Sequence, residues 1–357
     1  MKILVGLSGG VDSSVAALIL KEQGHDIFAA RMAIWNKNAK YNISNENKKG
    51  CFGPNEIENI EEAKKIANQL NIPFYTINCA TDYEKIVLNN FKEEYLDGHT
   101  PNPCVWCNSL IKFGIFPELV KENGYNFDKF ATGHYARIEE ENGRFLLKRG
   151  LDTNKDQSYF LYRLTQEQLK NIIMPLGNYT KEQIREIAKK NGLKSAEKVD
   201  SQDFYGGDYK DLLNVDEKIG NIVDTNGKIL GTHKGFWNYT IGQRKGICIS
   251  APEPLYVLEL KKETNEVIVG FADKTFKKSL IANQLNWIAI NELTSEKKVT
   301  AKIRSTQKPI PATIIPINNN EVKVIFDDLQ KSIAIGQSAV FYDEDIVIGG
   351  GIIQSAE

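Results

Sequence analysis

The residues best placed to do chemistry near the start of the chain form a glycine-rich loop between a predicted strand and a predicted helix. The segment Ser8-Gly9-Gly10-Val11-Asp12-Ser13-Ser14 follows one apolar run and opens the next. Glycines let the backbone approach an anion closely, and a helix N-terminus presents N–H donors and a positive dipole. The hydroxyls of Ser8 and Ser13 can add donors, and the Asp12 carboxylate can hold Mg²⁺ on a phosphate. The loop therefore predicts a phosphate site, and it matches neither a Walker loop nor a dinucleotide fingerprint.

A second reactive candidate is the Cys-x-x-Cys pair of Cys104 and Cys107, which follows His99-Thr100-Pro101-Asn102-Pro103. The two prolines predict a stiff, non-helical approach, with helical periodicity resuming at Ile111. A cysteine near a helix start is expected to have a lowered pKa and to be reactive. The spacing also suits half of a structural zinc site. The sequence has no second Cys-x-x-Cys or His pair to complete one, which favours a reactive or cluster-binding role.

The bulk composition is that of an average globular protein, because 41% of the residues are hydrophobic and 25% are charged. The net charge of −1 argues against indiscriminate binding of nucleic acid, although it leaves room for a local basic face. The first strand begins at once, without the pattern of a signal peptide, and no apolar run reaches membrane length. The five cysteines have no disulfide-framework spacing. We therefore expect a cytoplasmic protein with no membrane partner.

Strands and helices alternate in the first half of the chain, which predicts a parallel sheet covered on both faces. Strands are expected at 3–7, 26–34, 74–78 and 130–132, and helices at 15–23, 57–70 and 83–96. A hairpin turned at Asn142-Gly143 is expected over 136–148. Two capping boxes, Thr165…Gln168 and Thr180…Gln183, predict further helices, the second ending at Asn191-Gly192.

Beyond about residue 210 the pattern changes to short alternating runs separated by turn residues. Strands are expected at 256–260, 266–269, 299–303 and 322–326. This pattern predicts antiparallel β structure, a small barrel or sandwich. A chain of 357 residues exceeds a single core, so two or three domains are expected, with boundaries near 205–215 and 275–285.

The glycine-rich loop resembles the PP-loop of ATP pyrophosphatases, which split ATP between its α and β phosphates. The wider sequence is similar to the MnmA family of bacterial tRNA-specific 2-thiouridylases. The resemblance is carried by Thr100-Pro101-Asn102-Pro103, Cys107-Asn108, Ile111-Lys112-Phe113, Ala131-Thr132-Gly133-His134-Tyr135, Lys155-Asp156-Gln157-Ser158-Tyr159-Phe160-Leu161, Tyr239-Thr240-Ile241-Gly242-Gln243-Arg244-Lys245-Gly246, Gly336-Gln337-Ser338-Ala339-Val340-Phe341-Tyr342 and Gly349-Gly350-Gly351.

The resemblance implies an α/β PP-loop domain of the adenine nucleotide alpha hydrolase type, followed by a small central domain and a C-terminal β-barrel. These would span residues 1–208, 209–278 and 279–357. It also implies an enzyme, a sulfurtransferase that adenylates the oxygen at C2 of the wobble uridine of tRNA with ATP and Mg²⁺ and then installs sulfur. The expected partners are tRNAs with Lys, Glu or Gln anticodons and a sulfur donor, either a cysteine desulfurase or a sulfur-relay protein.

The same resemblance assigns expected roles to individual residues. Cys107 would deliver sulfur, with Asp12 and Cys104 as further catalytic residues. The residues expected to bind ATP are Gly6, Leu7, Ser8, Gly9, Gly10, Val11, Asp12, Ser13, Met32 and Gly133. Those expected to face tRNA or the target base are Asn102, Pro103, Cys104, His134, Lys155, Asp156, Gln157, Arg304 and Gln337.

The chain departs from the family at Tyr205, where the second cysteine of the family is expected. A phenol can neither carry a sulfane sulfur nor resolve a persulfide. Three readings follow: Cys104 resolves the persulfide; Cys104, Cys107 and Cys51 hold a [4Fe-4S] cluster that binds sulfide; or thiolation is lost and tRNA binding remains. A PP-loop ligase acting on a small metabolite is the competing enzyme class.

Overall fold

The computed structural model describes residues 1–36, 50–198 and 203–357, and the chain divides into two compact units. The first unit holds residues 1–87, 104–208 and 345–347, and the second holds residues 88–103, 209–344 and 348–357. Each unit is therefore assembled from segments that are far apart in the sequence. In the part of the chain that the structure describes, no helix combines the length and the apolar character needed to cross a bilayer.

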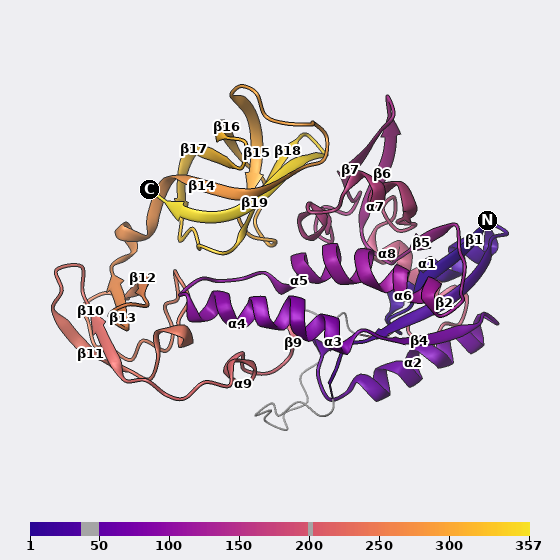
Figure 1. Cartoon of the computed structure of the whole chain (residues 1–357), viewed down its shortest axis with the longest axis horizontal. Coiled ribbons are helices and arrows are strands. Elements are labelled where there is room, and N and C mark those ends of the chain that lie inside the picture. The colour runs from indigo at the N-terminus through magenta and orange to yellow at the C-terminus, as the bar shows by residue number, and fades with distance from the viewer. Residues whose placement is uncertain (37–49, 199–202) are drawn as a thin grey trace. The chain divides into compact units, whose positions relative to one another are not determined.

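The first unit is built on a parallel sheet with the strand order β4-β2-β1-β5-β8 (Figure 1). The strands are β1 (Lys2–Gly6), β2 (Asp26–Ala33), β4 (Phe74–Asn78), β5 (Lys129–Ala131) and β8 (Ile172–Ile173). The side chains of Ile3, Leu4 and Val5 are all fully buried, as expected for a strand with both faces covered. The four strands predicted from apolar runs are confirmed. The two-residue β8 is too short to leave a pattern in the sequence.

Helices of the first unit pack around this sheet, and the core is shared between β1, β2 and helices α1, α2 and α8. The helices are α1 (Val11–Glu22), α2 (Glu56–Gln69), α3 (Ala80–Tyr83), α5 (Pro103–Trp106), α6 (Phe116–Glu122), α7 (Gln166–Asn171) and α8 (Lys181–Lys190), with the π-helices η1 (Glu84–Leu88) and η2 (Cys107–Ile115) and the 3₁₀-helix η3 (Ser158–Leu161). The predicted helix over 83–96 is confirmed as α3, η1 and the following α4 (Asn89–Leu96).

The expectation that the cysteine segment is non-helical up to Ile111 is wrong. The helix begins at Pro103, so Cys104 and Cys107 both lie within its first two turns. Proline is tolerated at the first helical position because the N–H that it lacks would have no partner there. The helix then continues as a nine-residue π-helix from Cys107, a rare form that is frequent at functional sites.

Both predicted capping boxes are confirmed, with Thr165 opening α7 and Thr180 opening α8. The predicted hairpin is also confirmed as β6 (Ala136–Glu141) and β7 (Arg144–Arg149). Its turn residues Asn142 and Gly143 have φ of 51° and 77°, the positive pair that a tight hairpin turn requires. A small parallel sheet that the sequence did not predict joins β3 (Gly50–Phe52) to β9 (Asp203–Tyr205).

The second unit contains a four-stranded sheet with the order β11-β10-β13-β12. Its strands are β10 (Gly220–Val223), β11 (Ile229–His233), β12 (Tyr256–Lys261) and β13 (Glu266–Gly270), accompanied by α9 (Lys210–Leu213) and the 3₁₀-helix η4 (Phe236–Asn238). The expectation of purely antiparallel pairing is wrong here, because β10 and β13 pair in parallel. The long connection between the two strands, which includes β11, η4 and β12, permits a parallel neighbour that a tight hairpin would forbid.

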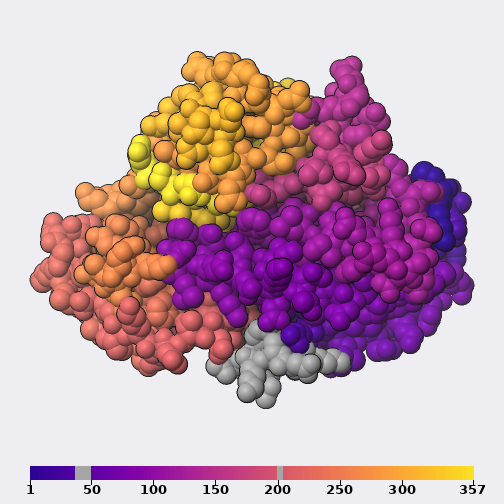
Figure 2. Space-filling view, viewed as in Figure 1, coloured from indigo at the N-terminus to yellow at the C-terminus, as the bar shows by residue number. Residues whose placement is uncertain are grey.

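Six further strands close into a barrel, with the order β14-β17-β16-β15-β18-β19 and a pairing of β14 with β19 that completes the ring. They are β14 (Phe276–Trp287), β15 (Lys297–Lys302), β16 (Ile310–Asn318), β17 (Glu321–Lys331), β18 (Ser338–Asp343) and β19 (Ile346–Ala356), preceded by η5 (Ala272–Thr275). These strands run from orange to yellow in Figures 1 and 2. Their inward side chains form a separate apolar core, and the predicted barrel is confirmed.

Candidate active site

The residues predicted to bind ATP come together at the carboxyl edge of the parallel sheet. Gly6 ends β1, Met32 lies near the end of β2, and Gly133 follows β5, and these three strands are adjacent. Because they are parallel, their ends share one edge, which is where open α/β sheets bind ligands. No Cβ fits at Gly133, since one would lie 2.7 Å from the backbone of Asp12 and Ser13. The segment after β5 therefore lies directly against the start of α1.

The loop between β1 and α1 is hydrogen-bonded internally through its own hydroxyls. Ser8 N donates to Ser13 Oγ at 3.1 Å, and the two hydroxyl oxygens lie 3.0 Å apart. Ser14 Oγ donates to the carbonyl oxygen of Gly10 at 2.7 Å. Gly9 has φ of +80°, where a side chain would be strained and would also press on Ala63. The loop thus presents backbone N–H groups at a helix N-terminus, the geometry of an anion site.

Two residues that were not predicted to be part of the site donate hydrogen bonds to the Asp12 carboxylate. Lys181 Nζ donates to both carboxylate oxygens, at 2.7 and 2.8 Å, and Tyr135 Oη donates to one of them at 2.7 Å. Lys181 is only 8% exposed although it is a lysine. The sequence could have indicated this role. A cation in the first turn of a helix is disfavoured by the helix dipole, so a lysine there is expected to have another function.

His134 connects this loop to the helix that carries the cysteines. Its Nδ1 lies 2.7 Å from Thr132 Oγ1, and its ring lies 5.6 Å from the ring of Phe113 in η2. Burial, aided by the nearby positive charge of Lys112, lowers the pKa of His134 well below its usual value. The imidazole is therefore neutral at physiological pH and can serve as a hydrogen-bonding group rather than a charge.

Cys107, the first residue of η2, is half-buried, and the prediction that its pKa is lowered is wrong. Burial of the thiol raises the pKa of Cys107 to about 12, Lys112 opposes this rise, and the charge of Cys51 adds to it. The desolvation of the thiolate outweighs the favourable charge nearby. Lys112 Nζ is itself held by Asn108 Oδ1 at 2.9 Å. The cysteine matched to sulfur delivery is thus protected rather than intrinsically reactive.

The arrangement of the thiols does not fit a metal cluster on Cys51, Cys104 and Cys107. Among residues 1–36, 50–198 and 203–357, no three His, Cys, Asp or Glu side chains are grouped closely enough to hold a metal ion. A cluster needs several thiolates around the same iron atoms. A single carboxylate can serve Mg²⁺ because phosphate oxygens and water complete its shell, so Asp12 fits that role.

The predicted tRNA loop of Lys155, Asp156 and Gln157 is tied to its own surroundings. The Asp156 side chain is 1% exposed and accepts from Gly150 N, Ser158 N and Ser158 Oγ. Gln157 Oε1 accepts from Tyr135 N at 3.0 Å. Asp156 and Gln157 therefore shape the loop and link it to Tyr135.

The second unit brings together other residues predicted to face tRNA. Gln337 Nε2 donates to the Pro101 carbonyl oxygen at 3.3 Å, and Asn102 Nδ2 lies 3.5 Å from Gln337 Oε1. Thr100 N donates to the Ile335 carbonyl oxygen at 2.8 Å, which fixes the segment against the barrel. Arg304, elsewhere on this unit, donates to the carbonyl oxygens of residues 331 and 332.

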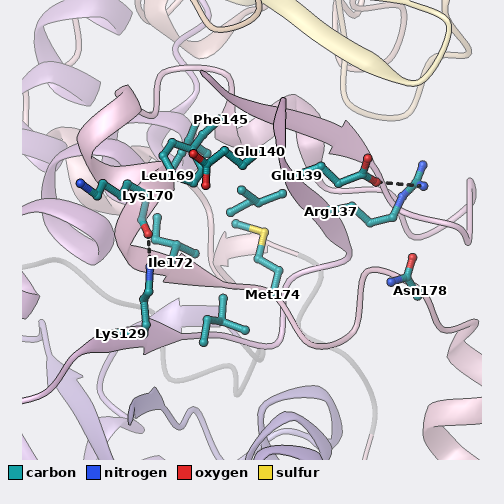
Figure 3. A pocket seen from close by; sticks show the side chains of 12 residues that line it. Lys129, Arg137, Glu139, Glu140, Phe145, Leu169, Lys170, Ile172, Met174 and Asn178 are labelled. Atoms are coloured by element: carbon teal, nitrogen blue, oxygen red, sulfur yellow. Dashed lines mark hydrogen bonds and ion pairs between the residues drawn. The ribbon is translucent and has the colours of Figure 1, made fainter. Parts of the chain in front are cut away.

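The first unit contains a pocket of about 360 Å³ (Figure 3). It is lined by the β6–β7 hairpin, α7 and β8, with Arg137, Glu139, Phe145 and Met174 among its walls. None of the residues predicted to bind ATP or tRNA lines it. Despite its size, this pocket is therefore not the candidate active site.

Comparison with known proteins covers nearly the whole chain. Three family descriptions match in succession: tRNA methyl transferase HUP domain over residues 1–205, tRNA methyl transferase PRC-barrel domain over 212–271 and aminomethyltransferase beta-barrel domain over 277–353. The tRNA-specific 2-thiouridylase MnmA of Endomicrobium trichonymphae is 51% identical over 362 residues, 99% of each chain. Its namesake from Clostridium botulinum (strain Alaska E43 / Type E3) is 46% identical over 361 residues, covering 99% of this chain and 98% of that one.

A more distant likeness exists to a solved structure, the U34-tRNA thiolase NcsA from Methanococcus maripaludis with its [4Fe-4S] cluster. It is 22% identical, covers 54% of this chain and 58% of that chain, and has a TM-score of 0.36. That distance is too great to transfer any chemistry.

Proposed function

The chain belongs to the MnmA family of tRNA-specific 2-thiouridylases, and from this we propose that it uses ATP to replace the O2 atom of the wobble uridine of tRNA with sulfur. ATP would adenylate O2, releasing pyrophosphate, and sulfur would then displace AMP at C2. The products are 2-thiouridine, AMP and pyrophosphate. Adenylation is required because an amide-like oxygen is a poor leaving group until it carries a phosphate ester.

The observation that carries this proposal is the contact between the phosphate loop and the cysteine helix through the segment after β5. Gly133 lies against Asp12 and Ser13, and the next residue, His134, packs on Phe113 of η2. Lys112 of the same helix acts electrostatically on both His134 and Cys107. A nucleotide on the loop and a sulfur on Cys107 would thus belong to one site, as a coupled adenylation and thiolation require.

Within this site each group has a proposed task. The N–H groups at the start of α1 and the hydroxyls of Ser8 and Ser13 would bind phosphate oxygens. Asp12 would hold the Mg²⁺ that accompanies ATP, with Lys181 beside it as a fixed positive charge that stabilises the splitting phosphates. Neutral His134 would donate a hydrogen bond to the target base or accept one from it. Cys107 would present sulfur to C2.

The partners follow from the same proposal. The substrate would be tRNA with a Lys, Glu or Gln anticodon, contacted in part by Asn102, Pro103, Cys104, Lys155, Arg304 and Gln337. The sulfur would come from a cysteine desulfurase or a sulfur-relay protein. An exposed thiol is the natural partner of such a donor, because transfer of a sulfane sulfur needs one sulfur to reach another.

The test is Asp12→Asn, with tRNA-dependent release of AMP and pyrophosphate as the readout. Removing the charge takes away the proposed Mg²⁺ ligand, so release should fall by at least about 10²-fold while the fold survives. Asp26→Asn, on an exposed aspartate of β2, is the matched control and should release AMP at the normal rate. Normal turnover by Asp12→Asn would refute the assignment of the loop. The 2-thiouridine content of tRNA from a deletion strain tests the product itself.

A further inference from the structure

The thiol of Cys107 is poorly placed to receive sulfur from outside. Its pKa is raised to about 12 by burial, so almost none of it is thiolate at neutral pH, and thiolate is the form that attacks a persulfide. A large donor also cannot bring its own sulfur into a site that tRNA must fill. A second, exposed thiol near Cys107 would meet the donor outside the site and hold the sulfur beside Cys107, which could then react as its proton passes to the departing thiol, without a free thiolate.

Cys51 is exposed and is held in a fixed place by the small sheet of β3 and β9. Its Sγ lies 3.5 Å from the carbonyl oxygen of Phe204. The strands approach so closely at Gly50 that a Cβ there would lie 2.7 Å from the same oxygen atom. The pairing sets Phe52 opposite Tyr205, the position at which the sequence lacks an expected thiol. Cys51 therefore brings a thiol to the strand pair that Tyr205 leaves without one.

The contacts of β3 lead toward Cys107. Phe52, the neighbour of Cys51, stacks on Tyr83 at a centroid distance of 5.3 Å and an interplanar angle of 17°. Tyr83 ends α3, and α3 packs against η2, which starts at Cys107. Cys51 and Cys107 are also near enough for the charge of one to affect the other. The exposed Cys51 and the half-buried Cys107 therefore lie in one region of the first unit.

Arg31 supplies a positive charge on the same side. Burial lowers the pKa of its guanidinium, and the charges of Glu56 and Cys51 oppose that change, so Cys51 lies within its field. Arg31 also donates to the carbonyl oxygen of Ser8 in the phosphate loop. Its Nε is buried and has no hydrogen-bond partner among the residues described. A cation beside a thiol favours the thiolate, the nucleophilic form.

We propose that Cys51 is the second sulfur-carrying residue of this enzyme, which accepts a sulfane sulfur from an external persulfide and passes it to Cys107. The proposal rests on the proposed thiolation of tRNA and names the residue that completes it. It differs from a cluster role for Cys51, since it needs no metal.

The steps balance in sulfur and electrons. The Cys51 thiolate attacks the outer sulfur of the donor persulfide, releasing the donor thiolate and leaving a persulfide on Cys51. Cys107 then takes that outer sulfur, giving its proton to the departing Cys51 sulfur. The terminal sulfur on Cys107 attacks C2 of the adenylated uridine and AMP leaves.

The last step releases the product. The Cys51 thiolate attacks Sγ of Cys107, a disulfide forms between the two cysteines, and the electron pair of the broken S–S bond stays on the sulfur at C2. The sulfane sulfur is thereby reduced by two electrons and the two thiols are oxidised. A cellular dithiol reductant must then reduce the disulfide before the next turnover.

The experiment uses the full chain, tRNA, ATP and glutathione persulfide as the donor, in a single turnover without reductant. The wild type should yield 2-thiouridine and a Cys51–Cys107 disulfide in peptide mass mapping. Cys51→Ser should still release pyrophosphate on adenylation but should form 2-thiouridine, and release AMP, at least about 10²-fold more slowly. Cys248→Ser, on another exposed cysteine, is the matched control and should thiolate normally. Cys51→Ala, with its circular dichroism spectrum, guards against a folding defect.

Three results would overturn the role of Cys51. One is thiolation by Cys51→Ser at the wild-type rate. Another is a disulfide between Cys104 and Cys107 in place of the expected one. The third is stoichiometric iron and acid-labile sulfide in the wild type that Cys51→Ser loses, which would make Cys51 a cluster ligand. Failure of the wild type itself to release AMP or to form 2-thiouridine would instead refute the proposed function.

Discussion

Lys181→Met removes the cation that grips Asp12 and is the sharpest test of how the site is built. The ammonium donates to both carboxylate oxygens, at 2.7 and 2.8 Å, so its loss leaves the Asp12 carboxylate, among the residues that the structure describes, with the hydroxyl of Tyr135 as its remaining donor. Methionine keeps the length and apolar stem of the side chain, which limits the change to the charge and its hydrogen bonds.

The expected cost follows from the burial of the pair. Removing one partner of a fully buried ion pair costs about 3–5 kcal/mol, because the other charge is left uncompensated. Here the Lys181 side chain is 10% exposed but that of Asp12 is 29% exposed, so water can relieve part of the penalty. We expect a loss of about 2–3 kcal/mol in the free energy of unfolding. We also expect a fall of about 10²-fold in AMP release, since a fixed charge beside the phosphates is lost.

A double-mutant cycle with Asp12→Asn provides the assay, with urea unfolding as the measurement. Asp12→Asn removes the uncompensated charge, so the double variant should be more stable than the sum of the single effects predicts, by at least about 1.5 kcal/mol. Lys190→Met changes an exposed lysine of the same helix and should alter stability by less than about 0.5 kcal/mol. Additive effects within about 0.5 kcal/mol would show that the two side chains are not coupled and would refute the reasoning.

Three further outcomes are expected. Thr180→Ala should cost about 1 kcal/mol by removing the cap of α8, whereas Thr180→Ser should cost little; equal costs in thermal melting would contradict a capping role. Alkylation of Cys107 by iodoacetamide should be negligible at pH 7 and should rise about tenfold per pH unit toward its pKa of about 12. The stability that the protonated thiol contributes should be lost as pH rises above about 8.5, the pKa of a cysteine in the unfolded chain. Fast labelling at pH 7 would disprove the burial of the thiol. The affinity for tRNA should fall steeply with salt, and Lys155→Ala should reduce the slope of log K against log salt by about 1; a flat response would point to a small-molecule substrate.

The regular elements were predictable because their signals are local. Apolar runs marked the central strands, and the residue pairs Thr165…Gln168 and Thr180…Gln183 marked two helix starts. The pairing of β3 with β9 was not predictable, since each strand has only three residues and they are about 150 positions apart. The parallel pairing of β10 with β13 likewise depends on a long connection whose path no local pattern records.

The candidate site likewise contains residues that local sequence predicts and residues that it does not. The phosphate loop could be recognised because its chemistry is contained in consecutive residues. Lys181 and Tyr135 were not predicted, because their role is to donate hydrogen bonds to Asp12, which is far away in the sequence. The pKa of Cys107 was predicted in the wrong direction, since a helix start is visible in sequence but the burial of one sulfur atom is not.

The grouping of Leu88–Pro103 with the second unit has a consequence for synthesis of the chain. In α4, Phe91 and Tyr95 are buried, and both rings contact Tyr209, whose ring lies 5.4 Å from that of Phe91. The segment also forms hydrogen bonds with Ile335 and Gln337, which are synthesised more than 230 positions after Pro103. At roughly 5–20 residues per second, the ribosome would take about 10–50 s to supply them. Tyr209 itself lies 114 positions beyond Tyr95, so for about 6–23 s the nascent chain carries the two aromatic side chains without its ring. This makes the helix the expected binding site of a chaperone during translation.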